Sequence, residues 1–346
     1  MTDSKDVLTW QSLTAMINEI KSPGTFLKSL LFSSNVETKP TETIELSYLS
    51  GDREVAPFVR KNGEAIMIAG YSETYATVEA PNIRLKRPLT PHPTLFDRKP
   101  GTVIFPSSGE QISAVQAHIA RDSQKIADHI ANAEEWMAAM AIRGTIAYEV
   151  EDGEVFTITF PKPAGHTVTV SPLWTTTSNP EADFQTASEL ISDSVGLVPT
   201  DAIMGRNAAA AFVKNARVMN LLDNRRIDFG FLELQNQFRD DGALYLGMFN
   251  GIRCWRYGRA LSVNGVSTRL IRDDYVEFVC ATPSAQNVAY YGAIPDWDAF
   301  EEGNFQGQRF SKSWKQKDPS VMQLLGHSRP LFVPRRPGSL VSMKVA

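Results

Sequence analysis

One long, narrow apolar stripe restricts the fold of this chain more than any other feature of its sequence. After Ser107, a suitable N-cap, apolar residues recur in steps of three, four or seven until Gly144. Such steps place side chains on one face of an α-helix, here of about ten turns and roughly 50 Å. We therefore predict a spine helix at residues 107–143 that lies across a sheet. A coiled-coil strand is the alternative, although systematic flanking ion pairs are absent. The stripe consists of Ile112, Val115, Ile119, Ile126, Ile130, Met137 and Met140.

The first forty residues predict an arm rather than a domain. Residues 7–20 carry one apolar stripe at helical spacing, and Ser22-Pro23-Gly24 ends that short helix. The patch from Phe26 to Phe32 is apolar but too short to form a core by itself. We expect it to dock on a larger body, either in the same subunit or in the next one.

Residues 42–82 predict a long hairpin. Ile44, Leu46 and Tyr48 alternate with polar residues, as in a half-buried strand. Asn62-Gly63 is the dipeptide that best tolerates the positive φ angles of a type I′ turn. The limb after it, residues 65–68, is apolar on both faces, and an isolated two-stranded hairpin is marginal in water. The hairpin therefore needs a partner, which is either another subunit or a larger sheet of the same chain.

The middle of the chain predicts alternating strands and helices. Asp152-Gly153 indicates a hairpin turn, and Pro180 begins a helix that extends to Asp193 and is closed by Gly196. The other predicted elements are strands at 148–150, 155–160, 167–170, 243–248, 252–257 and 275–280 and a helix at 207–222.

The C-terminal segment predicts a return to the first domain. Residues 331–333 and 340–345 are apolar and strand-compatible, whereas a free chain end is usually frayed. We take residues 197–310 as an inserted second domain, and we expect the final strands to pair with residues 155–160 of the first.

Composition and charge set outer bounds. A chain of 346 residues with 42% hydrophobic content can bury one large core or two moderate ones. A basic segment followed by an apolar run is missing at the start, and no run approaches the roughly 18 apolar residues of a membrane span, so secretion and membrane insertion are not expected. Cys254 and Cys280 lie in apolar surroundings, which favours free buried thiols over a disulfide.

The net charge of −4 argues against a protein that grips nucleic acid. Two basic clusters remain, and they would contact DNA or the carboxylates of a neighbouring subunit. A solvated face is the simpler interpretation, and we favour it. The clusters are Arg84-Leu85-Lys86-Arg87 and the group of Arg253, Arg256, Arg259, Arg269 and Arg272.

The sequence predicts no catalytic, cofactor-binding or metal-binding residue. Phosphate-binding glycine loops, zinc signatures and a nucleophile elbow are missing, and the acidic pairs are typical of exposed loops. His118, Asp122 and His129 share one side of the predicted spine helix, but they lack a further ligand, so a metal site is disfavoured. The other histidines, His92, His166 and His327, lie beside Pro or Gly, where solvated side chains are expected. An enzyme remains an alternative only with a site assembled from distant residues.

The order of several landmarks resembles the major capsid proteins of lambda-like tailed phages, the capsid protein E family. These landmarks are Phe26-Leu27-x-x-Leu30-x-Phe32, Glu42-x-Ile44-x-Leu46-Ser47, Pro57-Phe58-Val59, Gly63-Glu64, Glu134-Glu135, Trp314, Asp318-Pro319, Ser328-x-Pro330-Leu331 and Val341-Ser342. The resemblance implies an α+β protein with the Hong Kong 97-type capsid fold. It further implies an N-arm (1–41), an extended loop hairpin (42–88), a peripheral domain (89–196 and 311–346) with the spine helix, and an axial domain (197–310).

The resemblance also implies a function. The expected protein is the major capsid protein of a tailed phage, which assembles with itself into hexamers and pentamers of an icosahedral head around packaged double-stranded DNA. Its implied partners are scaffold and portal proteins, a decoration protein and, non-specifically, the DNA, with no membrane. The expected location is the capsid shell of the virion, assembled in the bacterial host cytoplasm. A capsid-like cellular nanocompartment shell is the alternative.

Overall fold

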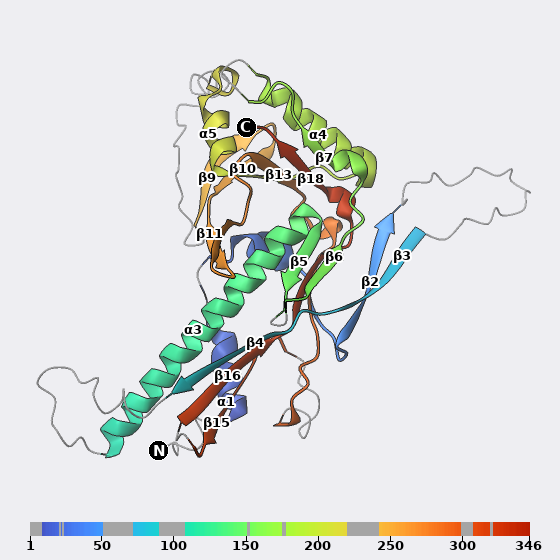
Figure 1. The fold of residues 1–346 in the computed structure, drawn as a ribbon. Coiled ribbons are helices and arrows are strands. Elements are labelled where there is room, and N and C mark those ends of the chain that lie inside the picture. The colour runs from blue at the N-terminus through green and yellow to red at the C-terminus, as the bar shows by residue number, and fades with distance from the viewer. Residues whose placement is uncertain are drawn as a thin grey trace, which may run out of the picture.

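The computed structural model describes residues 9–20, 22, 24–50, 72–89, 108–150, 153–174, 178–219, 242–298, 307–318 and 321–346. It is a mixed α+β structure in which one long helix runs obliquely between several small sheets (Figure 1). The helices are α1 (Trp10–Glu19), α3 (Ser108–Arg143), α4 (Pro180–Val195) and α5 (Arg206–Lys214), together with short helical turns at Lys28–Phe32, Ala164–His166, Pro283–Ala285 and Pro337–Ser339.

Helix α3 confirms the predicted spine helix. It has 36 residues and is therefore about 54 Å long. Along its described side chains, Ile119, Ile126, Ile130 and Met137 are buried, as the apolar stripe predicts. They pack against sheets on successive turns of the helix, so the stripe marks a helix that lies across sheets. Ser107, the predicted N-cap, lies outside the described residues.

The largest sheet has six strands in the order β7-β18-β13-β8-β10-β9. Helices α4 and α5 cover one face, and the C-terminal end of α3 approaches the other (Figure 1). Between the sheet and α4 and α5 lies an aromatic core of Trp174, Phe184, Phe212, Phe249 and Phe278. The strands are β7 (Thr167–Thr169), β8 (Asp201–Met204), β9 (Ala243–Phe249), β10 (Ile252–Tyr257), β13 (Tyr275–Val279) and β18 (Leu340–Lys344).

The predicted partner of the C-terminal strands is wrong. Strand β18 pairs antiparallel with β13 and parallel with β7, and β17 (Pro330–Pro334) pairs with β14 (Asn287–Tyr291). Strand β6 (Val155–Thr159), the expected partner, pairs with β5 (Thr145–Glu149) in a hairpin. A strand with two buried faces carries no pattern that identifies its neighbour, and β18 is such a strand. The last strand thus joins β13, which the sequence assigned to the axial domain, and β7, which it assigned to the peripheral domain.

A three-stranded sheet lies beside the N-terminal part of the spine helix. Its order is β15-β16-β4, with β15 (Phe310–Gln316), β16 (Val321–Ser328) and β4 (Ile83–Leu89). Leu324 of this sheet packs with Ile126 of α3 and Ile17 of α1, so the two helices share one face of the sheet. A further sheet, β1-β14-β17, adds β1 (Val36–Thr38) beside β14.

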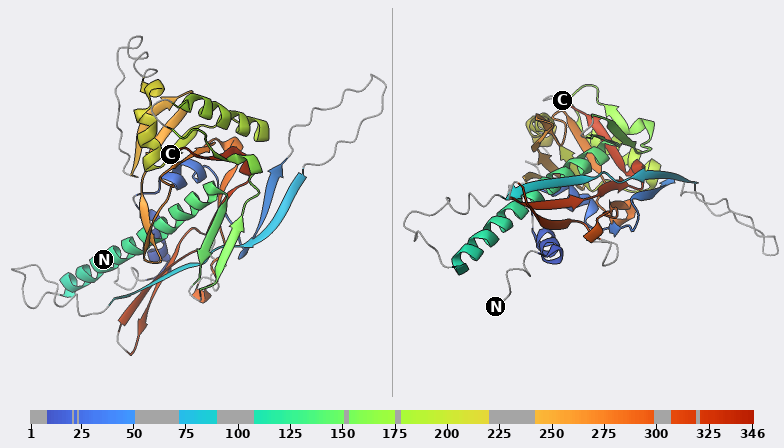
Figure 2. Two further views of the ribbon diagram at one scale, coloured as in Figure 1. Left: turned by 45° about the horizontal axis from the view of Figure 1, so that its top comes forward. Right: turned by 60° about the horizontal axis from the view of Figure 1, so that its bottom comes forward.

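Two further hairpins flank the body, and a third extends from it. The pairs β5-β6 and β11 (Ala260–Val263) with β12 (Val266–Arg269) are short. Strands β2 (Thr43–Ser50) and β3 (Ser72–Glu79) pair antiparallel over their whole length and extend outward from the body (Figures 1 and 2). This pairing confirms the predicted hairpin. The side chains of Ile44, Leu46 and Tyr48 in β2 are buried in the main core. The turn at Asn62-Gly63 and the limb at 65–68 lie outside the described residues.

Two predicted helices have different bounds in the structure. The helix predicted at 207–222 breaks at Asn215, because the Asn215 side-chain oxygen accepts a hydrogen bond from the backbone N–H of Arg217 at 3.0 Å. The helix that begins at Pro180 extends to Val195 before Gly196, which has the positive φ of +71° that ends helices. Cys254 and Cys280 are free and buried, as predicted.

His166 and His327 were expected to be solvated, but both are buried. A ring nitrogen of His166 lies 3.0 Å from the carbonyl oxygen of Leu340, and His327 contacts the side-chain oxygen of Asn82. A neighbouring Gly or Pro in the sequence indicates a loop, but it does not show that the histidine side chain contacts Leu340 or Asn82. His92 lies outside the described residues. No helix in the described part of the chain is both long and apolar enough to cross a membrane.

Candidate functional site

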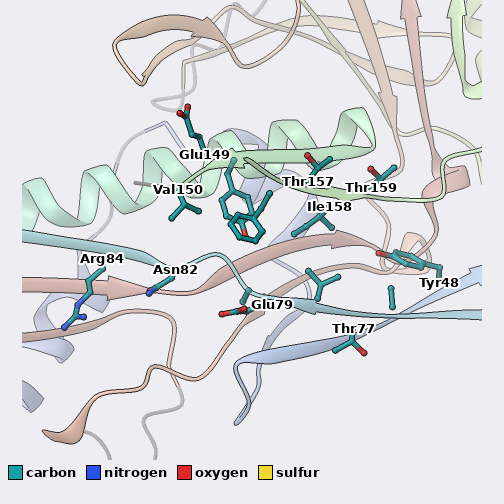
Figure 3. A pocket seen from close by; sticks show the side chains of 15 residues that line it. Tyr48, Thr77, Glu79, Asn82, Arg84, Glu149, Val150, Thr157, Ile158 and Thr159 are labelled. Atoms are coloured by element: carbon teal, nitrogen blue, oxygen red, sulfur yellow. The ribbon is translucent and has the colours of Figure 1, made fainter. Parts of the chain in front are cut away.

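A cleft lies where the projecting hairpin meets the body. It has a volume of about 830 Å³ and is open to solvent on one side. Figure 3 shows Tyr48, Thr77 and Glu79 on one side of the cleft and Thr157 and Ile158 on the other. The lining residues come from β2, β3, β4, β5 and β6 and from the positions just beyond β3 and β5: Tyr48, Ala76, Thr77, Val78, Glu79, Ala80, Asn82, Arg84, Tyr148, Glu149, Val150, Phe156, Thr157, Ile158 and Thr159.

The lining is suited to an extended polypeptide. Phe156 is 47% exposed and stacks on Tyr148 with the ring centroids 5.7 Å apart, which leaves a large apolar surface facing solvent. The sheets on the two sides, β2-β3 and β5-β6, have two strands each, so in the described structure every one of these strands has an edge without a paired strand. Exposed strand edges and apolar side chains together favour association with another chain.

The polar groups of the cleft include two carboxylates, three threonine hydroxyls, one amide, one guanidinium and two tyrosine phenols. Burial, and then the neighbouring Tyr290, raise the pKa of Tyr48 to about 12, and burial followed by the charge of Glu79 raises the pKa of Tyr148. Both phenols therefore stay neutral at physiological pH. The Glu149 carboxylate accepts a hydrogen bond from the Asn264 side chain at 2.8 Å, which joins the β11-β12 hairpin to this wall. Nothing in this arrangement resembles paired acid and base groups around a reacting atom.

Two buried carboxylates on the spine helix anchor the N-terminal segment. Glu134 accepts from the ammonium of Lys28 at 2.8 Å, from the guanidinium of Arg309 at 3.0 Å and from the hydroxyl of Tyr291 at 3.1 Å. Burial alone would raise the pKa of Glu134, but the charges of Lys28 and Arg309 outweigh it and hold the pKa below its ordinary value. A charged Glu134 thus links three segments that are far apart in the sequence.

Glu135 binds the backbone of the same N-terminal segment. Its two oxygens accept from the N–H groups of Leu27 at 2.7 Å and Lys28 at 3.0 Å, and one also accepts from the hydroxyl of Tyr257 at 2.8 Å. These N–H groups begin a helical turn and have no partner within it, so the carboxylate acts as a cap from another helix. The apolar patch at 26–32 therefore docks on its own subunit, with Phe26 packed on Tyr257.

Glu135 makes the stability of the fold depend on pH. Burial raises the pKa of Glu135 from its ordinary value of 4.5 to about 7, despite the donors around it. The folded chain therefore holds a proton between pH 4.5 and 7 that the unfolded chain has lost. The contribution of this group to stability is full below pH 4.5 and is lost as the pH rises to about 7, by up to about 1.4 kcal/mol per pH unit.

Comparison with Glu135→Gln isolates this effect. We expect the free energy of unfolding of the unassembled chain, measured by chemical denaturation, to fall more steeply between pH 5 and 7 in the parent than in the variant. His166 and His327 have lowered pKa values and contribute the opposite slope, but they are common to both proteins. Parallel pH profiles would show that Glu135 does not titrate in this range.

Several of the basic and metal-ligating candidates of the sequence form ion pairs within the chain. Asp122 pairs with Arg87 at 2.6 Å, although it shares a helix face with His118. No group of three metal-ligating side chains occurs among the residues described by the structure. Arg253 pairs with Asp201 and Arg272 with Glu277, so these two arginines serve contacts within the chain. The exposed basic side chains of β4 are Arg84 and Lys86.

The anchoring of the N-terminal segment by Glu134 and Glu135 was not predicted from the sequence, although the spacing of the apolar stripe indicates that position 134 is buried. The apolar stripe steps by seven from Ile130 to Met137 and so passes over position 134, where a helical stripe would place a buried residue. A buried carboxylate at such a position requires cations beside it, and Lys28 and Arg309 are those cations. Neither cation is close to position 134 in the sequence, so the sequence alone does not identify them.

Comparison with known proteins gives one family. Residues 9–345 match the model of the family described as Phage major capsid protein E. A search of curated proteins found no match to this sequence.

Solved structures show the same fold at low sequence identity. A prophage protein of Escherichia coli CFT073, described as a capsid protein, has a TM-score of 0.71 at 17% identity and covers 98% of this chain and 99% of its own. A phage-related protein of Bordetella bronchiseptica RB50 has a TM-score of 0.55 at 12% identity, covering 98% and 97% of the two chains. The capsid of Cyanophage A-1(L) has a TM-score of 0.52 at 10% identity, covering 94% of each. These similarities show the Hong Kong 97-type capsid fold.

Proposed function

The chain belongs to the phage major capsid protein E family, and on that premise we propose that it assembles into hexamers and pentamers of an icosahedral phage head that encloses packaged double-stranded DNA. The projecting β2-β3 hairpin and the adjoining cleft carry this proposal. The apolar face of β2 packs on the body through Ile44, Leu46 and Tyr48. In the described structure each strand of this two-stranded sheet still has an unpaired edge, which a neighbouring subunit would cover.

The occupant that we propose for the cleft is a segment of a second copy of the chain. The cleft presents the exposed ring of Phe156 between two-stranded sheets, and a shell places identical subunits next to one another at high local concentration. The family consists of phage major capsid proteins, and membership in it favours a phage head over a cellular nanocompartment shell. The division into N-arm, extended loop, peripheral and axial domains belongs to the same proposal, with β18 assigned to the axial sheet.

The proposed partners act at different stages of assembly. Scaffold and portal proteins would act during assembly in the bacterial cytoplasm, and a decoration protein would bind the finished shell. Contact with DNA would be weak and non-specific, since the net charge of the chain is −4 and a container must release its contents. The proposed role is structural rather than catalytic, and the buried carboxylates Glu134 and Glu135 support it because they hold segments of the chain together.

Shortening the hairpin tests the proposed function. Replacement of residues 51–71 by a short turn is expected to leave a folded subunit that no longer forms shells, because the described strands β2 and β3 keep their pairing and their contacts at the foot. Circular dichroism measures the folding, and sedimentation with electron microscopy measures the assembly.

A variant of matched length serves as the control. Substitution of residues 51–71 by a glycine-serine segment of equal length keeps the connection but removes its side chains. Loss of assembly in both variants assigns the contact to those side chains. Loss of secondary structure in the shortened chain would instead place the segment in the core of the subunit and contradict its role in assembly.

A further inference from the structure

Arg329 connects the foot of the projecting hairpin to the body. It is the single residue between β16 and β17, and its side chain is only 3% exposed. One terminal nitrogen lies 3.2 Å from the carboxylate of Glu42, and the other lies 3.1 Å from the carboxylate of Glu79. Glu42 directly precedes β2, and Glu79 is the last residue of β3. One buried guanidinium therefore holds both strands of the hairpin where they leave the body.

The geometry at Arg329 restricts the direction of the hairpin as well as its position. The same two nitrogens donate to the carbonyl oxygens of Ala80 at 3.3 Å and Ala293 at 3.4 Å, which lie on the hairpin side and on the body side of the junction. A guanidinium is planar and rigid, so four acceptors around it fix an orientation that a flexible ammonium would not. Gly292 packs so closely there that an added Cβ would lie 3.2 Å from the Cβ of Ala80.

The three charged side chains at the foot of the hairpin differ in their exposure to solvent. Arg329 is buried, while the side chains of Glu42 and Glu79 are 51% and 69% exposed. Removal of the arginine would leave two carboxylates that water can solvate, so the subunit should still fold. Removal would take away the side chain that contacts both strands at the foot of the hairpin, while Ile44, Leu46 and Tyr48 of β2 would stay packed in the core. Glu79 also lines the cleft, so the contact that directs the hairpin lies next to the surface proposed for a second copy.

We propose that Arg329 is a positioning residue, which fixes the angle at which the β2-β3 hairpin leaves the body and thereby sets the width of the cleft beside it. The consequence for shells rests on the proposed capsid function. The Arg335 side chain makes a second contact between the body and the hairpin by donating to the hydroxyl of Ser47, but it contacts β2 only.

Distances between spin labels on the two walls of the cleft test the proposal in the unassembled full chain. Thr77→Cys on β3 and Thr157→Cys on β6 are exposed label sites on opposite walls. Burial raises the pKa of Cys254 and of Cys280 to about 12, so the native thiols should react slowly. We expect a single narrow distance distribution in the parent and a broad one in Arg329→Met, which keeps an apolar chain but removes the donors.

Two further variants make the outcome decisive. Arg87→Met removes an ion pair between β4 and the spine helix away from the hairpin and should leave the distribution narrow. If Arg329→Met fails to fold, Glu42→Gln together with Glu79→Gln removes the same ion pairs at exposed positions and should also broaden the distribution. An unchanged distribution in every folded variant of the Arg329 contacts would overturn the proposal.

Assembly gives a separate readout. If the parent forms shells, Arg329→Met is expected to give open or irregular particles by electron microscopy, while Arg87→Met gives closed ones. Closed, regular shells from a variant with a broad distribution would show that the hairpin angle does not matter in the shell. If the parent forms no shells, the proposed function fails, but the distance measurement still decides whether Arg329 positions the hairpin.

Discussion

Removal of residues 338–346 is expected to leave an insoluble or unfolded chain. Strand β18 lies inside the six-stranded sheet, where it pairs with β13 over five residues and with β7 over three. Three of its apolar side chains, Leu340, Val341 and Met343, are at most 2% exposed, and so is that of the next residue, Val345. Burial of one such side chain contributes about 1.5–3 kcal/mol, so their sum is comparable to the about 5–15 kcal/mol of a whole domain.

The truncation also opens edges that the intact chain covers. Strands β7 and β13 would each lose a neighbour, and the carbonyl oxygen of Val345 would no longer accept from the N–H of Trp174 at 2.6 Å. Expression followed by sedimentation measures the result. A chain without residues 1–5 is the control and should stay soluble, because its shortened end lies before the first described element. Soluble, cooperatively folding protein from the C-terminal truncation would show that β18 is dispensable for the sheet.

Elements with a strong local pattern were predictable from the sequence. The spine helix was found within one residue of its described ends, because its stripe has the period of a helix over many turns. Pro180 and Gly196 located the helix α4 for a similar reason, since each residue has a specific backbone preference at a helix end. The alternation in β2 likewise predicted a strand of the hairpin that projects from the body.

Strand partners and buried charges were not predictable in the same way. Leu340 faces the core around the spine helix, whereas Val341 and Met343 face the core under α4. The apolar residues of β18 indicate that both of its faces are buried. They do not identify β13 and β7 as its neighbouring strands. Glu134 and Arg329 depend on partners more than a hundred residues away, such as Lys28 and Glu79, and only the fold brings these groups together.

Ile126→Asp is expected to abolish cooperative folding or to reduce the free energy of unfolding by about 4 kcal/mol or more. Ile126 is 3% exposed and packs against the backbone of β16 at Gly326, where an added Cβ would lie within 2.2 Å of the isoleucine. A carboxylate there would be buried among the side chains of Leu13, Ile17 and Leu324. Arg87, a cation at this interface, is already paired with Asp122 one turn earlier. The new charge would be unpaired, which is among the costliest substitutions in a core.

Gln124→Ala on the same helix is the matched control. Gln124 is half-buried, and its side chain donates to Asp128 at 2.9 Å along the helix surface. Such a contact is worth about 0.2–0.5 kcal/mol, and the better helix propensity of alanine offsets part of it. The midpoint of chemical denaturation should therefore move little for Gln124→Ala and strongly for Ile126→Asp. Equal shifts would mean that the helix is not packed along its apolar stripe, and the position of every segment anchored to the spine helix, including the N-terminal segment at Glu135, would have to be reassigned.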